Sequence, residues 1–155
     1  MKFSVWLESV EYSPEAIELA QKIVNGTVKL HNGSIDEPTV MYDAIWKPVP
    51  QLPVFINIKA NLPGKGLGWI AFLDFLSKVN ANQQFTSTDF TPAGKALFSK
   101  AVSLGLMKQL PSQNNIGNYT LWLVTADTDP ILNKISSSSP SPNTSIMANR
   151  MQKSI

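Results

Sequence analysis

The sequence predicts an α+β fold: a single small domain in which a short mixed sheet packs against three helices, with an extended C-terminal arm. Three observations support this prediction. One stretch has a strongly apolar helical pattern, several short segments alternate apolar and polar residues, and both patterns fade after Pro130. A β-α-β order at the start of the chain makes an α/β arrangement the alternative. We expect a globular domain over residues 1–130 and a Ser/Pro-rich basic arm over residues 131–155.

The most apolar stretch predicts a central helix over residues 68–81. Apolar side chains recur there at helical spacing and surround most of the helix, so neighbouring elements must cover it on two or three sides. Asp74 and Lys78 stand four residues apart in the order that favours a helical ion pair. We expect both of them on the exposed polar stripe of this helix.

Two further helices are predicted from their end signals. Ser13 and Pro14 suit the N-cap and first position of a helix over residues 14–25. The helix predicted over residues 92–104 starts in the same way, with Thr91 as N-cap and Pro92 at the first position. It ends before Gly105, a residue that readily adopts the left-handed backbone of a helix terminus.

Strands are predicted where side chains alternate between two faces. Residues 40–46 are compatible with a strand but are flanked by prolines. The clearer expected strands cover residues 2–8, 27–31, 53–59 and 118–125.

The composition limits the classes of function. Charged residues make up 15% of the chain, against roughly a quarter in typical soluble domains, which suggests a surface partly covered by a partner. The chain has no cysteine, which excludes disulfides and thiol chemistry, and one arginine, which argues against arginine forks on guanine or phosphate. No secretory or membrane-spanning apolar run is found, so the expected location is cytoplasmic or in a virion.

Four short motifs suggest chemistry only weakly. The glycine loop 64–68 precedes a helix but lacks the spacing of either phosphate-binding motif, so an enzyme using it is the least favoured hypothesis. Residues 47–53 have the proline spacing of an SH3 ligand, and we interpret them as a stiff connection. Asp127 to Asp129 lack a third acid for a metal, and His31 lacks a nucleophile motif. We therefore expect no catalytic, cofactor or metal site, and a protein that is not an enzyme.

The first functional hypothesis is an interaction or assembly subunit of a larger complex, such as a virion or a multisubunit machine, with a protein as its partner. Trp6 shares a strand face with polar residues and is a candidate contact, because tryptophan is enriched at interface hot spots. Residues 130–155 contain three cations and no acid. Such a segment orders on a partner more readily than alone. Its expected contacts are Ile146, Met147, Arg150 and Met151.

Residues 69–125 resemble part of a winged-helix domain. The resemblance is carried by a helix ending in Ser-Leu-Gly-Leu at residues 103–106, a polar turn over residues 112–118, and the strand that follows. It implies a second hypothesis, a nucleic-acid-binding protein. The residues expected to carry that binding, from one helix and its exit, are Lys95, Lys100 and Lys108.

Overall fold

The computed structural model describes residues 12–46, 52–61, 64–88, 92–111 and 120–138. Within them the chain forms four helices and seven strands, which confirms the predicted α+β class. In chain order the elements are α2 (Pro14–Val24), β1 (Leu30–His31), β2 (Ser34–Ile35), β3 (Val40–Ile45), β4 (Val54–Ala60), α3 (Leu67–Val79), β5 (Gln84–Ser87), α4 (Pro92–Ser103), β6 (Met107–Leu110), β7 (Thr120–Val124) and α5 (Asp129–Ser136).

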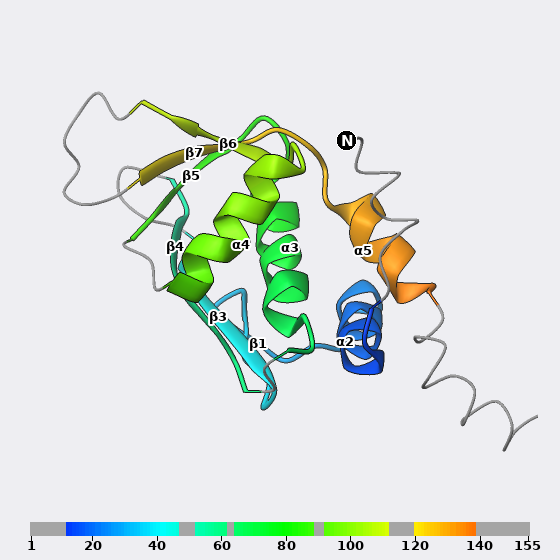
Figure 1. The fold of residues 1–155 in the computed structure, drawn as a ribbon. Coiled ribbons are helices and arrows are strands. Elements are labelled where there is room, and N and C mark those ends of the chain that lie inside the picture. The colour runs from blue at the N-terminus through cyan, green and yellow to red at the C-terminus, as the bar shows by residue number, and fades with distance from the viewer. Residues whose placement is uncertain (1–11, 47–51, 62–63, 89–91, 112–119, 139–155) are drawn as a thin grey trace, which may run out of the picture.

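The main sheet has five strands in the order β3-β4-β5-β7-β6. Only β4 and β5 pair in parallel, and the other neighbours are antiparallel, so the sheet is mixed as predicted. The helices α3 and α4 lie across one face of this sheet (Figure 1). The helices α2 and α5 pack against each other and against α3.

The helix α3 forms the centre of the core, because side chains around almost its whole circumference are buried. Its Phe75 ring contacts Tyr42 of β3, Phe55 of β4 and Phe85 of β5 with centroids 4.8–5.9 Å apart. Phe72 meets Phe98 of α4 at 4.7 Å. The three pairs of Phe75 are edge-to-face, and such pairs add stability beyond the apolar area that they bury.

The helix ends follow the predicted signals, and each boundary lies within two residues of the predicted one. The Ser13 hydroxyl accepts a hydrogen bond from the Ala16 N–H at 3.1 Å, as an N-cap does. At the end of α4, Gly105 has φ 78°, and the next residue, Leu106, is buried. The Leu106 N–H donates to the Ala101 carbonyl at 3.0 Å, which turns the chain from α4 into β6.

The helix α5 is a correction to the prediction, which assigned residues 131–155 to an arm outside the domain. Ile131, Leu132 and Ile135 are buried in the same core as α3. The Thr128 hydroxyl donates to the Leu73 carbonyl at 2.8 Å, and the Gln21 amide donates to the Ser136 carbonyl at 3.1 Å. The globular domain therefore includes α5, and the rest of the expected arm, residues 139–155, lies outside the described residues.

Four strands differ from the prediction. The expected strand over residues 27–31 is reduced to β1, which pairs only with β2 in a separate two-stranded sheet. The short strands β2, β5 and β6 were not predicted, whereas residues 40–45 do form a strand. The expectation for 53–59 is confirmed as β4, and that for 118–125 is confirmed over its described residues as β7. The expected strand over residues 2–8 lies outside the described residues.

Asp74 is also a correction, because it is only 5% exposed rather than on a polar stripe. Its carboxylate accepts a hydrogen bond from the Tyr42 hydroxyl at 2.8 Å and pairs with the Lys78 ammonium at 3.0 Å. The same ammonium donates to the Gly33 carbonyl at 2.7 Å, in the turn between β1 and β2. A buried carboxylate needs such partners, and these join α3 to β3 and to the small hairpin.

We predict that Ile135→Ala lowers the free energy of unfolding by about 2–5 kcal/mol, because it removes buried methylenes from the core. The measurement is urea denaturation followed by far-UV circular dichroism. The matched control is Lys134→Ala, which changes an exposed residue of the same helix and should have little effect. Equal effects of the two substitutions would contradict the placement of α5 in the core.

A pH-dependent prediction follows from Tyr42. Burial, reinforced by the nearby Asp74 carboxylate, holds the pKa of the Tyr42 phenol well above its ordinary value of 10.0. Above that pH the unfolded chain ionises this phenol while the folded chain keeps it protonated. The contribution of Tyr42 to stability is therefore complete below pH 10.0 and declines above it, by about 1.4 kcal/mol per pH unit.

We expect Tyr42→Phe to be less stable than the parent near neutral pH by about 1–3 kcal/mol, because Asp74 loses a donor. This deficit should shrink as the pH rises to about 11, since the variant has no phenol to titrate at this position. Urea denaturation of both proteins across this range measures it. A deficit that stays constant or grows would show that Tyr42 is not held protonated in the folded chain.

Candidate functional site

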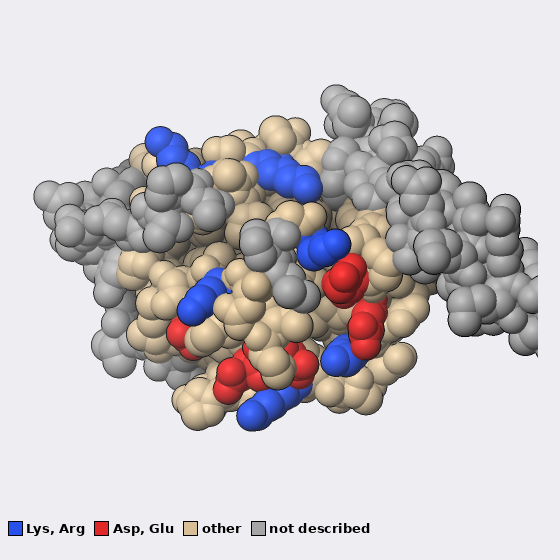
Figure 2. Space-filling view, turned by 60° about the horizontal axis from the view of Figure 1, so that its bottom comes forward, with Lys and Arg blue, Asp and Glu red and all other residues tan. Residues whose placement is uncertain are grey.

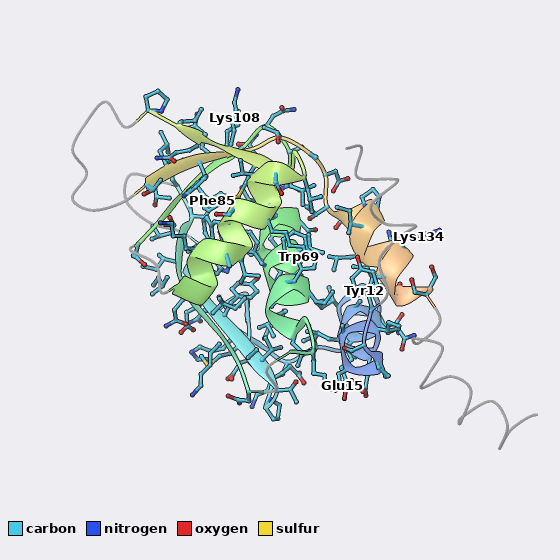
Figure 3. The ribbon with its side chains drawn as sticks, in the orientation of Figure 1. Tyr12, Glu15, Trp69, Phe85, Lys108 and Lys134 are labelled. Atoms are coloured by element: carbon cyan, nitrogen blue, oxygen red, sulfur yellow. The ribbon has the colours of Figure 1, made fainter. Side chains whose placement is uncertain are left out.

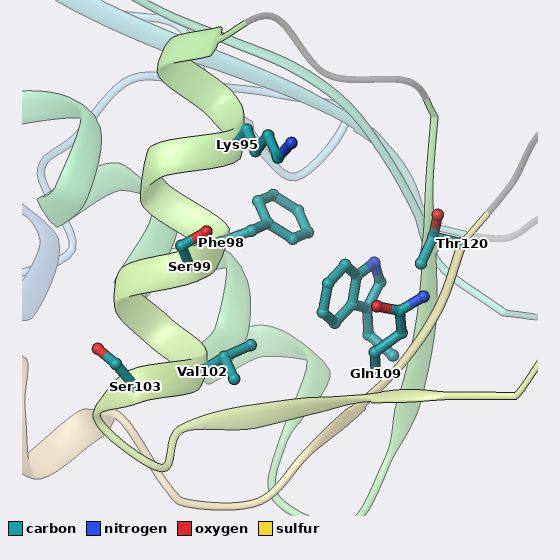
Figure 4. Close-up of a pocket in the computed structure, with 8 residues that line it drawn as sticks. Lys95, Phe98, Ser99, Val102, Ser103, Gln109 and Thr120 are labelled. Carbon is teal, nitrogen blue, oxygen red and sulfur yellow. The ribbon is translucent and has the colours of Figure 1, made fainter.

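A pocket of about 420 Å³ opens between α4 and the hairpin of β6 and β7. Its volume lies in the range that ligand pockets usually have. The helix contributes one wall and the two strands contribute the other, as Figure 4 shows. The described residues that line it are Lys95, Phe98, Ser99, Val102, Ser103, Gln109, Thr120 and Trp122.

The wall on α4 follows from helical spacing. Lys95, Ser99 and Val102 recur at intervals of four and three residues, so they share one face of the helix. Phe98 lies next to them and points toward the core, where it is 2% exposed. Val102 is 42% exposed, so an apolar side chain stands at the mouth of the pocket.

Two aromatic rings form the floor of the pocket. Phe98 and Trp122 lie with their centroids 5.1 Å apart, and both are buried. The Trp122 indole N–H donates to the Ser87 hydroxyl at 2.9 Å, which fixes the ring against β5. Because both rings are held from behind, the floor presents a preformed apolar surface.

The rim of the pocket is polar and carries positive charge. Ser99, Ser103, Gln109 and Thr120 provide hydroxyl and amide groups. Lys95 is the only charged side chain among the described residues that line the pocket, and it is exposed. The arrangement therefore favours a group that combines a large apolar surface with a hydrogen-bond acceptor or a negative charge.

The three lysines predicted for nucleic-acid binding do not share one surface. Lys95 lies at the pocket, whereas the Lys100 ammonium lies 4.3 Å from the centroid of the Trp69 ring on another side of α4. Burial lowers the pKa of Lys100 below its ordinary value. Lys108 is exposed on β6, where Figure 3 labels it. Because successive side chains of a strand alternate between its faces, Lys108 points to the opposite face from Gln109.

The resemblance to a winged helix is met in part by the geometry. The helix α4 is followed by the antiparallel hairpin β6–β7, as that resemblance implies. Where the second helix of the motif would lie, the chain instead forms β5 over residues 84–87, which pairs with β7. Sequence reasoning identified Lys95 but missed the floor of the pocket, for which the only local signal was Trp122 in an apolar strand.

The residues predicted to contact a protein partner all lie outside the described part of the chain. They are Trp6, Ile146, Met147, Arg150 and Met151. The structure therefore adds α4 and the β6–β7 hairpin as a candidate surface, without bearing on those five residues.

Two of the other motifs have structural partners, whereas residues 47–51 lie outside the described residues and His31 is exposed on β1. Lys65 of the glycine loop pairs with Glu15 at 3.9 Å, and its carbonyl accepts from the Ser13 hydroxyl. Asp127 accepts from the Asp129 N–H at 3.0 Å at the start of α5. On the face seen in Figure 2, lysines and acidic side chains lie side by side. Throughout the described ranges, no group of three His, Cys, Asp or Glu side chains is placed to hold a metal ion.

Two further findings bear on the class of protein. In the part that the structure describes, every helix is too short or too polar to cross a membrane. Comparison of the chain with protein-family models, with curated proteins and with solved structures finds no match. Its function is therefore inferred from its own residues.

Proposed function

We propose that this domain is a non-enzymatic interaction subunit of a larger assembly, and that it binds a segment of a protein partner in the pocket between α4 and the β6–β7 hairpin. The observation that supports this proposal is the pocket floor of Phe98 and Trp122 beneath a rim that carries Lys95. A cytoplasmic or virion location remains part of the proposal.

The chemistry of the pocket matches that of an interaction hot spot. Such hot spots place a large anchor side chain in a well-packed apolar pocket surrounded by polar groups that exclude water. Here the apolar contact would come from the two rings and from Val102, and the polar surroundings from Ser99 and Gln109. A side chain of a folded or extended partner can bury its apolar surface there without leaving a buried polar group unpaired.

We predict that selection from a displayed library of random heptapeptides on the intact protein enriches peptides with a large apolar residue and an acidic residue. Their affinity should fall at least about ten-fold in Val102→Lys, because the new charge stands at the mouth of the pocket. The matched control is Val24→Lys: Val24 lies on α2 and is 44% exposed, against 42% for Val102. Binding is measured by fluorescence polarisation of the labelled peptides.

Thermal melts of both variants establish that each is folded before binding is compared. Failure to enrich any peptide would contradict the proposal. Enriched peptides that bind Val102→Lys as tightly as the parent would also contradict it, because their contact would lie elsewhere.

Nucleic-acid binding is the second candidate, and the observation that favours it is the placement of α4 directly before a β-hairpin with Lys95 and Lys108 exposed. Phosphate contacts of lysines release counterions, so such binding would weaken steeply with salt.

This candidate predicts that short duplex DNA binds at about 50 mM salt and is largely released at about 200 mM. Lys95→Ala/Lys108→Ala should weaken binding and reduce its salt dependence, whereas Lys100→Ala should change it little because Lys100 is directed at Trp69. Electrophoretic mobility shifts at the two salt concentrations measure this. No binding by the parent at the lower concentration would exclude the candidate.

A further inference from the structure

The strand β6 forms the end of the five-stranded sheet among the described residues. Its free edge can be assigned from the hydrogen bonds of β7 and of the residue that follows it. Val124 accepts from the Asn82 N–H at 2.8 Å and donates to the Gln83 carbonyl at 2.9 Å, so its backbone groups point toward β5. The next residue, Thr125, donates to the Leu106 carbonyl at 2.8 Å, toward β6.

This alternation fixes which residues of β6 face outward. Backbone groups of successive strand residues point to opposite sides, so Lys108 and Leu110 pair with β7 across the register Lys108↔Leu123 and Leu110↔Leu121. The N–H and C=O groups of Met107 and Gln109 therefore point away from the sheet. No strand of the described part of the chain pairs with this outer edge.

The outer edge of β6 adjoins the pocket. Gln109 is cross-strand to Trp122, and both side chains line the pocket. A strand added beside β6 would place the residue opposite Gln109 on that same face, because cross-strand neighbours share a face. One extended segment can thus pair with the edge and direct a side chain toward the rings of Phe98 and Trp122.

The edge is short, which limits how a partner pairs with it. Pro111 occupies the next outward position after Gln109 and has no N–H to donate. A proline and an exposed lysine are features that restrict unselective pairing at sheet edges. Two residues of backbone pairing give little affinity alone, so binding at this edge depends on the side chain that enters the pocket.

We propose that the partner is an extended segment of a protein, which adds as a short strand to the outer edge of β6. It inserts one large apolar side chain into the pocket and places an acidic residue, two positions along, against Lys95. This inference rests on the proposed function and specifies the partner of that same pocket.

The spacing and charge of the pocket fit this ligand. Lys95 and Val102 are seven residues apart, which corresponds to about 10 Å of helix, with the rings of Phe98 and Trp122 between them. Side chains two residues apart on a strand are about 6.5–7 Å apart and on the same face. A segment anchored over the rings therefore brings its next same-face residue toward Lys95, where a carboxylate matches the charge.

The probe is the peptide acetyl-Thr-Val-Trp-Val-Glu-Thr-amide, titrated into the intact isotope-labelled protein and followed by NMR. We expect shifts at Gln109 and at the Trp122 indole N–H, and slower exchange of the outward Gln109 amide with solvent. Replacing the Trp of the peptide by Ala should weaken binding at least about ten-fold. Methylating the backbone nitrogen of the Trp should weaken binding about ten-fold if the peptide pairs antiparallel to β6, and methylating that of the second Val should do so if it pairs parallel, because these are the N–H groups that reach the Gln109 carbonyl.

A charge exchange tests the acidic position. Replacing the Glu of the peptide by Lys should weaken binding about two- to five-fold, as exposed ion pairs do, and Lys95→Glu should restore it for that peptide. Lys108→Glu makes the same charge change on the opposite face of β6 and should restore nothing.

The outcomes separate the two proposals. If neither this peptide nor any displayed peptide binds, the proposed function fails. Suppose that this peptide binds, that Val102→Lys abolishes its binding, and that both N-methylated peptides bind as well as the unmethylated one. The pocket is then supported as the binding site, and strand addition is overturned. If displayed peptides bind and this one does not, the assigned ligand chemistry is overturned.

Discussion

The burial of α3 is the constraint on which the rest of the structure depends. A helix that is apolar around nearly its whole circumference is stable only if several elements cover it. The sheet covers one side, α4 a second, and α2 with α5 a third. Its one buried carboxylate, Asp74, needs Tyr42 and Lys78 as partners, and these also tie down the small hairpin of β1 and β2. The need to cover α3 also explains why α5 belongs to the domain.

The pocket is a consequence of how α4 packs to cover α3. One side of α4 contributes Phe98 and Ala101 to the core above α3 and the sheet. The next side, with Lys95, Ser99 and Val102, projects over the β6–β7 hairpin. The Trp122 indole N–H donates to the Ser87 hydroxyl, and the ring lines the pocket between α4 and the hairpin. Core packing therefore accounts for the rigid floor, whereas the rim residues are exposed and do not hold the fold together.

The elements with strong local patterns were predictable from the sequence. α2, α3 and α4 have periodic apolar faces and end signals, and β4 and β7 alternate clearly. β5 and β6 are four residues each and carry Gln, Thr, Ser and Lys, so they become strands through pairing with β7 rather than through local preference. α5 has buried Ile131 and Ile135 at helical spacing, but it spans only eight residues and precedes a serine run, so its burial between α2 and α3 had no clear local signal.

The candidate site, like the fold, was only partly predictable from the sequence. Lys95 was identified from charge alone, but the pocket combines it with side chains from two strands, and no single window of sequence contains that combination. Lys95 and Lys100 do not share a face of α4, because five residues correspond to about 140° around a helix. The two lysines thus point to different sides of α4, one toward the pocket and one toward Trp69. Charge on a helix indicates a binding surface only when its angular position is taken into account.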